Sequence, residues 1–139
     1  MGLAPGLMSY MRTVVADTDT MTAMGTGDVP MLAMPRLLEL ADVAAVAAIA
    51  PSLEPGVTSV GTSAVIEYKQ PSPIGAEVGV YAELTQVDGR RLVFSFIARQ
   101  KQPSGSPDDE DAVVAAGTME RVLVDRDRFV GRAAAEPGH

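Results

Sequence analysis

The longest apolar stretch of the chain runs from Met34 to Pro51 and reads MPRLLELADVAAVAAIAP. Pro35 suits the first turn of a helix, where a missing N–H leaves no hydrogen bond unmade. Pro51 disfavours helical backbone at the residue before it, so the helix should end there. Every residue from Val43 to Ala50 is apolar, and a helix that is apolar all round must be covered on all sides. The pattern therefore predicts one long, buried central helix.

Strand-like segments lie on both sides of this helix. In the segment before it, Tyr10, Arg12, Val14 and Ala16 would share one face of a strand. Asp88-Gly89 separates two later segments and predicts a type I′ hairpin turn, in which both central residues have positive φ. The predicted strands cover residues 9–16, 57–70, 76–87, 90–101 and 112–125, with a short capped turn at 17–24 and a short helix at 126–135.

The order of these elements is strand, long helix, then four strands in succession. It contains no alternating βαβ units, which argues against a doubly wound fold. We predict an α+β fold in which an antiparallel β-sheet wraps around one long central helix. One sheet leaves part of the helix uncovered, so a symmetric homodimer is expected, with a tetramer left open. The 139 residues are expected to form a single domain over residues 1–139, with disordered tails at 1–8 and 132–139 and a mobile loop at 102–111.

Composition narrows the possible chemistry. The chain has no cysteine, and its single histidine is the last residue, His139. Disulfides, thiolate nucleophiles, histidine triads and metal sites are therefore not expected. A net charge of −7 without a basic run argues against nucleic acid and anionic membrane as partners. No apolar run approaches the roughly 20 residues of a membrane span, and the N-terminus lacks the pattern of a signal peptide, so a cytoplasmic location is expected.

Several segments, in this order and spacing, resemble the hotdog-fold thioesterase superfamily, and within it the fluoroacetyl-CoA thioesterase-like group. They cover most of the chain from Val29 to Phe129. The resemblance implies the hotdog fold and hydrolysis of a small or medium acyl thioester, with coenzyme A only as part of the substrate and no other cofactor. The matching segments are MLAMPRLLELADVAAVAAIAP, SLEPG, VGTSAVIEY with PSPIG, VDGRRLVFSFIA and GTMERVLVDRDRF.

In that group a threonine at the helix start, a helix glutamate and a strand histidine act together. Matching by spacing places Met34 at the threonine, Asp42 at the glutamate and Tyr68 at the histidine. Gly61 matches a glycine whose backbone lies near the acyl group. The resemblance thus implies Asp42 as base or nucleophile, Tyr68 as a hydrogen-bond donor to an oxyanion, and Gly61 in the oxyanion environment. Alternatives are that Asp42 is a structural acid paired with an arginine or a hydroxyl near the dimer interface, and that Tyr68 is a strand residue at a pocket rim.

The candidate substrate-binding residues surround this set. Met34 would line an apolar pocket, and Thr62 would position water. Arg90 and Arg91 at the hairpin, together with Arg36, are candidates to hold the phosphates of coenzyme A, although simple surface charge is at least an equal alternative. Glu39 is also a candidate substrate-binding residue, and it is expected to pair with Arg36 or Arg91.

Three functions remain open at this point. The first is an acyl-CoA thioesterase. The second is a catalytically silent hotdog protein that binds an acyl thioester or another apolar small molecule, because the threonine and the histidine are missing. The third and weakest is a hydratase, a class that typically pairs an acid with a histidine.

Overall fold

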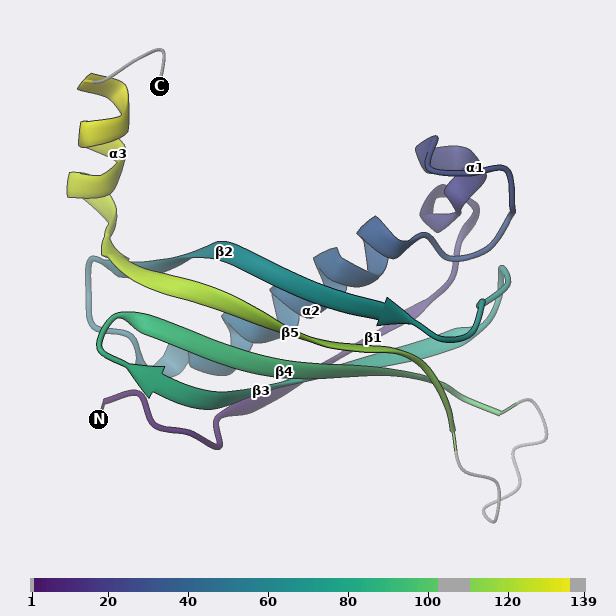
Figure 1. The fold of residues 1–139 in the computed structure, drawn as a ribbon, viewed down its shortest axis with the longest axis horizontal. Helices are drawn as coiled ribbons and strands as arrows, with labels where there is room; N and C mark the ends of the chain where they lie inside the picture. The colour runs from purple at the N-terminus through teal and green to yellow at the C-terminus, as the bar shows by residue number, and fades with distance from the viewer. Residues whose placement is uncertain (1, 103–110, 136–139) are drawn as a thin grey trace.

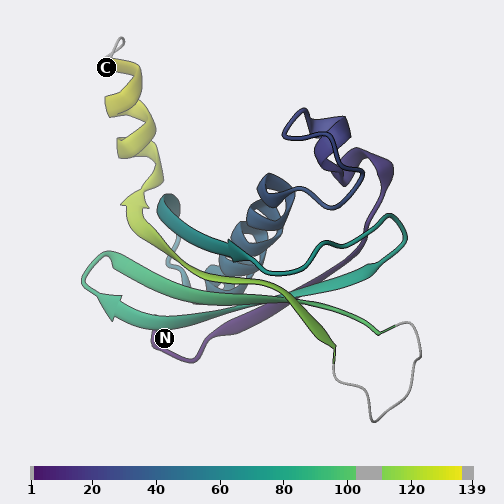
Figure 2. The same ribbon diagram turned by 45° about the vertical axis from the view of Figure 1, so that its right-hand side comes forward.

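The computed structural model describes residues 2–102 and 111–135, and it shows a single antiparallel sheet curled around a long helix (Figure 1; Figure 2). The strand order is β1-β3-β4-β5-β2, and every pair of neighbours is antiparallel. The strands β1 and β2 therefore form the two edges of the sheet. Their bounds are β1 Met8–Val14, β2 Val57–Tyr68, β3 Glu77–Asp88, β4 Arg91–Gln100 and β5 Ala112–Asp125.

The central helix α2 spans Met34–Ile49 and continues as a 3-10 turn, η2, over Ala50–Ser52. Its buried residues recur every three or four positions, and they pack mainly against β1 and β3. The opposite face is open, with Val43 and Val46 each 43% exposed. The single sheet reaches only one side of α2, which agrees with the expectation that part of the helix stays uncovered within one chain. The buried positions are Leu37, Leu40, Ala41, Ala44, Ala45, Ala48 and Ile49.

The strands alternate between a face on the helix and an outer face. In β1, Tyr10, Arg12 and Val14 are exposed, which confirms the predicted shared face. In β3 and β4, Leu84 and Phe94 are fully buried toward the helix. Period-2 alternation with one face buried fixes the register, because a slip by one residue would turn these side chains to solvent.

The β3–β4 hairpin is present, but its turn differs from the prediction. Asp88 pairs with Arg91, so the two central residues are Gly89 and Arg90. Only Gly89 has positive φ, at 62°, since every non-glycine residue of the described chain has negative φ. A positive φ at the first central position is the feature of a type II′ turn, which favours glycine there.

The connection before α2 contains two short helical turns. They are η1 (Asp17–Asp19) and α1 (Met21–Met24). The Thr20 hydroxyl accepts a hydrogen bond from the Ala23 N–H at 3.2 Å and caps α1. This confirms the predicted capped turn.

Two segments near the ends of the described chain, residues 2–8 and 132–135, differ from the predicted disordered tails. The Gly6 N–H donates to the Leu84 carbonyl at 2.8 Å, and Leu3 and Leu7 pack against the core. The prediction of a disordered tail is therefore wrong for residues 2–8, because Leu3 and Leu7 bury apolar surface against the core. The helix α3 spans Arg126–Ala135, so residues 132–135 are helical rather than part of the tail at 132–139. Residues 136–139 and most of the predicted loop at 102–111, residues 103–110, lie outside the described chain.

Candidate active site

The candidate acid Asp42 lies in the middle of α2 and is paired with an arginine from β5. Its Oδ1 accepts a hydrogen bond from Arg121 Nη1 at 2.7 Å. The Arg121 side chain is 9% exposed and the Asp42 side chain 50% exposed, so the ion pair is buried on one side and open on the other. Oδ2 of Asp42 has no hydrogen-bond partner within residues 2–102 and 111–135.

Arg121 is itself held by β2. Its Nε donates to Ser59 Oγ at 2.8 Å, and its Nη2 donates to the Ser59 carbonyl at 3.1 Å. The planar guanidinium therefore binds Asp42 and Ser59 at the same time, a task that suits its rigid fork of donors. Together these contacts fix the position of Oδ1 of Asp42.

Gly61 lies directly beside this pair. A Cβ atom at position 61 would stand 3.4 Å from Arg121 Nη1 and 3.8 Å from Asp42 Oδ1. A larger side chain would therefore press on the ion pair. A register shift between Gly61 and Ser63 marks a β-bulge at the same place, and bulges commonly redirect strands next to functional sites.

Thr62, inside this bulge, does not join the cluster. Its hydroxyl donates to the Glu120 carbonyl at 3.3 Å, and the residue is exposed. Arg91 pairs with the Glu120 side chain. Because Leu92 is buried toward the helix, alternation places Arg91 on the outer face of the sheet. The sheet thus separates Arg91 from Asp42.

The start of α2 holds a second charge cluster. Arg36 Nε donates to Asp19 Oδ1 at 2.9 Å, and Nη1 of the same guanidinium contacts Glu39. This contact confirms the predicted pairing of Glu39 with Arg36. Oδ2 of Asp19 also accepts from the Ala16 N–H at 2.8 Å, so Asp19 ties the preceding turn to the helix. Met34, at the first position of α2, is 44% exposed.

Tyr68 lies at the far end of β2 from the Asp42 pair. Its hydroxyl donates to the Leu32 carbonyl at 2.6 Å. Burial raises the pKa of this phenol above its usual value, and a backbone hydrogen bond involving Ser72 opposes that shift. Tyr68 is seven residues from Gly61, about 23 Å along a strand. Met34 is eight residues from Asp42, about 12 Å along a helix. One chain therefore brings together Asp42 and Gly61, but not Tyr68 or Met34.

Sequence reasoning missed three members of these clusters, namely Arg121, Ser59 and Asp19. For Arg121 a signal was present. In GTMERVLVD the neighbours two residues away, Met119 and Leu123, are apolar and share the inner face. A charged residue between them on that face requires a buried partner. Ser59 and Asp19 are found only from tertiary contacts.

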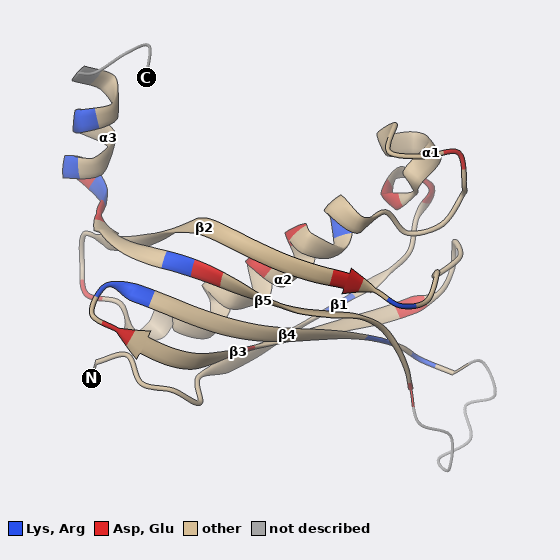
Figure 3. Cartoon of the chain, in the orientation of Figure 1, with Lys and Arg blue, Asp and Glu red and all other residues tan. Residues whose placement is uncertain are grey.

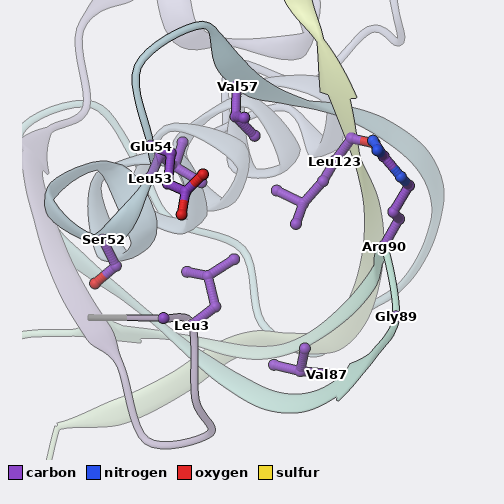
Figure 4. A pocket seen from close by; sticks show the side chains of 10 residues that line it. Leu3, Ser52, Leu53, Glu54, Val57, Val87, Gly89, Arg90 and Leu123 are labelled. Carbon is purple, nitrogen blue, oxygen red and sulfur yellow. The ribbon is translucent and has the colours of Figure 1, made fainter.

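A cavity of about 360 Å³ lies beyond this site, between the end of α2 and the β3–β4 hairpin (Figure 4). Its walls are mostly apolar, and Glu54 and Arg90 stand at its edge. Leu123, which lines it, is two residues from Arg121 on the same face of β5. The cavity thus comes within about 7 Å of Arg121 along β5, although neither Arg121 nor Asp42 lines it.

Two features are absent from the part of the chain that the structure describes. Within residues 2–102 and 111–135, no group of three or more His, Cys, Asp or Glu residues is arranged to hold a metal ion. No helix in the described chain has the length and apolarity that a membrane crossing requires.

Comparison with known proteins points to one family. The family model described as FlK, fluoroacetyl-CoA-specific thioesterase, matches residues 15–127. The chain is similar to the fluoroacetyl-CoA thioesterase of Streptantibioticus cattleyicolor, with 36% identity over 93 residues, which are 67% of this chain and 60% of that protein. The alignment thus spans less than two thirds of that relative.

Solved structures agree with this match. A structure of the fluoroacetyl-CoA thioesterase FlK superposes with a TM-score of 0.82 at 27% identity, over 98% of both chains. A phenylalanine-to-alanine variant of FlK in complex with fluoroacetate and CoA gives a TM-score of 0.76 at 27% identity, over 91% of this chain and 99% of that one. A threonine-to-serine variant was crystallised with acetyl-CoA. These matches confirm the predicted hotdog fold and the resemblance read from the sequence.

Proposed function

Because this chain belongs to the fluoroacetyl-CoA-specific thioesterase family, we propose that it hydrolyses small acyl-CoA thioesters, with fluoroacetyl-CoA and acetyl-CoA as the first candidates. The observation that supports this best is the half-exposed carboxylate of Asp42, which Arg121 holds beside Gly61. Structures of FlK with fluoroacetate and CoA, and with acetyl-CoA, support the substrate class.

In the proposed reaction, Oδ2 of Asp42 takes a proton from a water molecule while the water oxygen attacks the thioester carbonyl carbon. The tetrahedral intermediate, with its oxyanion near the backbone of Gly61, then collapses as the C–S bond breaks. The thiolate leaves and is protonated, and the products are a carboxylic acid and the free thiol. A thiolate needs little help to leave, so this route is compatible with the lack of a histidine before His139. Direct attack by the carboxylate would use the same oxygen.

A catalytically silent binding protein is the second candidate. Two observations favour a binding function over thioesterase activity in this chain. Met34 presents a thioether where the family threonine would stand, and the Tyr68 hydroxyl is engaged by the Leu32 carbonyl. If Asp42 cannot act without these partners, the chain would bind acyl thioesters without turnover.

We further infer that the working form is a homodimer. The open face of α2 exposes Val43 and Val46, and β2 is an edge strand on which Val65 is 62% exposed. Apolar surface beside an unpaired strand edge is unfavourable in water. A second copy of the chain that pairs along β2 would cover both features with one symmetric interface.

The deciding experiment measures thiol release from short to long acyl-CoA esters, with Asp42→Asn run alongside. Asn keeps an acceptor oxygen for Arg121 but is not a base. We expect turnover to fall by roughly 10²- to 10⁴-fold, the usual contribution of general base catalysis. The fold should be retained by circular dichroism, but the melting temperature should fall because Asn leaves the buried charge of Arg121 without a counter-charge. Wild-type turnover in the variant would refute the role of Asp42. Saturable binding of an ester without release by the original protein would select the binding protein.

A further inference from the structure

Positive charge gathers at one end of this acidic molecule. The whole chain has 11 Lys and Arg residues against 18 Asp and Glu residues. Nevertheless, arginines cluster where α3 leaves the sheet next to the β3–β4 hairpin (Figure 3). Arg90 from the hairpin turn and Arg128 and Arg132 from α3 line one hollow of about 360 Å³, the arginine hollow. Phe129 also lines this hollow, and it lies three residues before Arg132 on α3, a spacing that makes the two side chains neighbours.

The arginines of this hollow differ from the others in their partners. Arg36, Arg91 and Arg121 are each held by a carboxylate. In contrast, neither Arg128 nor Arg132 makes an ion pair with any residue of 2–102 or 111–135.

The remaining charges leave the hollow positive. Arg90 Nη1 donates to a neutral group, the Leu123 carbonyl, at 3.3 Å. Asp125 is the acidic residue among those that line the hollow, and its Oδ1 accepts from the Arg128 backbone N–H at 2.9 Å. Three guanidinium groups therefore face one carboxylate, so the hollow favours an anion with more than one charge.

We propose that the arginine hollow binds the phosphorylated adenosine end of coenzyme A, an inference that rests on the acyl-CoA function proposed above. Each guanidinium can donate two parallel hydrogen bonds to phosphate oxygens. Phe129 borders the hollow and is 47% exposed, which leaves its ring open for stacking on the adenine base. A purely inorganic anion would not need this ring.

The remainder of the coenzyme has a path to the reacting centre. Arg90 and Leu123 line the cavity at the end of α2 (Figure 4). The same two residues line the arginine hollow, so the two spaces are adjacent. The pantetheine arm would lie in that cavity along Leu3, Leu53 and Val57. The cavity begins at Leu123, about 7 Å along β5 from Arg121. This places the thioester at Asp42 and the phosphates at α3.

The test is the double variant R128Q/R132Q, with R126Q as the matched control. Arg126 is on the same helix, does not line the hollow and pairs with Asp127 at 3.2 Å. Substrates are acetyl-CoA and acetyl-pantetheine, which lacks the nucleotide. We expect kcat/KM for acetyl-CoA to fall at least about tenfold through KM, as lost charge-assisted hydrogen bonds require, with acetyl-pantetheine unchanged. F129A should also raise KM for acetyl-CoA, and R126Q should behave as the original protein.

Equal losses on both substrates, an equal loss in R126Q, or no loss at all would overturn the proposal. A loss seen with an acyl carrier protein thioester but not with acetyl-CoA would overturn it too. Calorimetric titration with free CoA separates this site from the proposed function. If no ester is hydrolysed, yet CoA binds the original protein and not R128Q/R132Q, the hydrolysis proposal fails and the site stands. If hydrolysis occurs and both proteins bind CoA equally, the site fails alone.

Discussion

At the scale of single residues, Arg121 organises the candidate site. It bridges α2 and β2 through one buried guanidinium that contacts Asp42, Ser59 Oγ and the Ser59 carbonyl. A buried cation is tolerated only when it is paired and hydrogen-bonded. Asp42 therefore neutralises Arg121, and in the proposed reaction it would also present its second oxygen to water.

Replacing Arg121 by Lys keeps the positive charge opposite Asp42 but removes the guanidinium geometry that positions it. A lysine retains the charge opposite Asp42 but cannot reach both acceptor atoms of Ser59 with one ammonium group. We expect the free energy of unfolding to fall by about 1–3 kcal/mol, measured by urea denaturation. Turnover should fall by roughly tenfold or more, because misplacement of a reacting group by about 1 Å can cost on the order of 100-fold. Arg91→Lys is the control, since its exposed pair with Glu120 should contribute less than about 1 kcal/mol. An R121K protein with unchanged turnover would show that Arg121 does not position Asp42.

Tyr68→Phe tests whether the phenol acts on an oxyanion or on the backbone. The hydroxyl donates to the Leu32 carbonyl, so its loss should lower the free energy of unfolding by about 1 kcal/mol and leave turnover near its original value. Loss of an oxyanion donor would instead lower kcat by roughly 10²- to 10³-fold. A kcat loss of that size would restore the role implied by the family resemblance.

The same variant has a predicted pH signature. Burial raises the pKa of Tyr68 in the folded chain, so the folded state favours the neutral phenol. The stability that this phenol provides is complete below its unfolded pKa of about 10 and declines as the pH rises through the higher folded value. We expect the melting temperature of the original protein to decline more steeply above pH 10 than that of Tyr68→Phe. Parallel declines would contradict this.

At the scale of elements, the strands and the helix could be predicted because each has a periodic signal of its own. Strand β5 begins and ends where the sequence placed it, at Ala112 and Asp125. The bulge at Gly61 and the turn type at Gly89 could not be predicted. Both depend on which residue of one strand faces which residue of the next, and such register arises from tertiary packing rather than from local pattern.

The candidate site likewise contains residues that the sequence indicated and residues that only tertiary packing brings together. Asp42 could be singled out from the sequence because a carboxylate beside a wholly apolar run is unfavourable unless it is paired or functional. Gly61 could be singled out because its spacing matches a glycine of the family. The partner of Asp42 lies on β5, at Arg121, where only the alternation of the strand hinted at an inward-facing charge. The orientation of Tyr68 was beyond the sequence, since its acceptor is a backbone carbonyl of another segment.

At the scale of the whole molecule, the open face of α2 predicts a homodimer. Val46→Glu places a charge on that face and should convert the dimer to a monomer that stays folded, because Val46 is already 43% exposed in the single chain. Light scattering after size exclusion measures the mass. Val130→Glu is the matched control, since Val130 is 53% exposed on α3, away from this face. A monomeric original protein, or a V46E protein that remains dimeric, would contradict the proposed interface.

The contact between Asp42 and Arg121 also bears on the order in which the chain folds. The two residues are 79 positions apart in sequence, whereas Asp42 and Gly61 are joined by one short connection between α2 and β2. Closing a longer loop costs more chain entropy, and contacts of high sequence separation form slowly. Arg121 can therefore reach Asp42 only when β5, the last strand of the chain, has joined the sheet. The Asp42–Arg121 ion pair is therefore expected to form late in folding. Until β5 has joined the sheet, Asp42 lacks the arginine that holds its carboxylate in place.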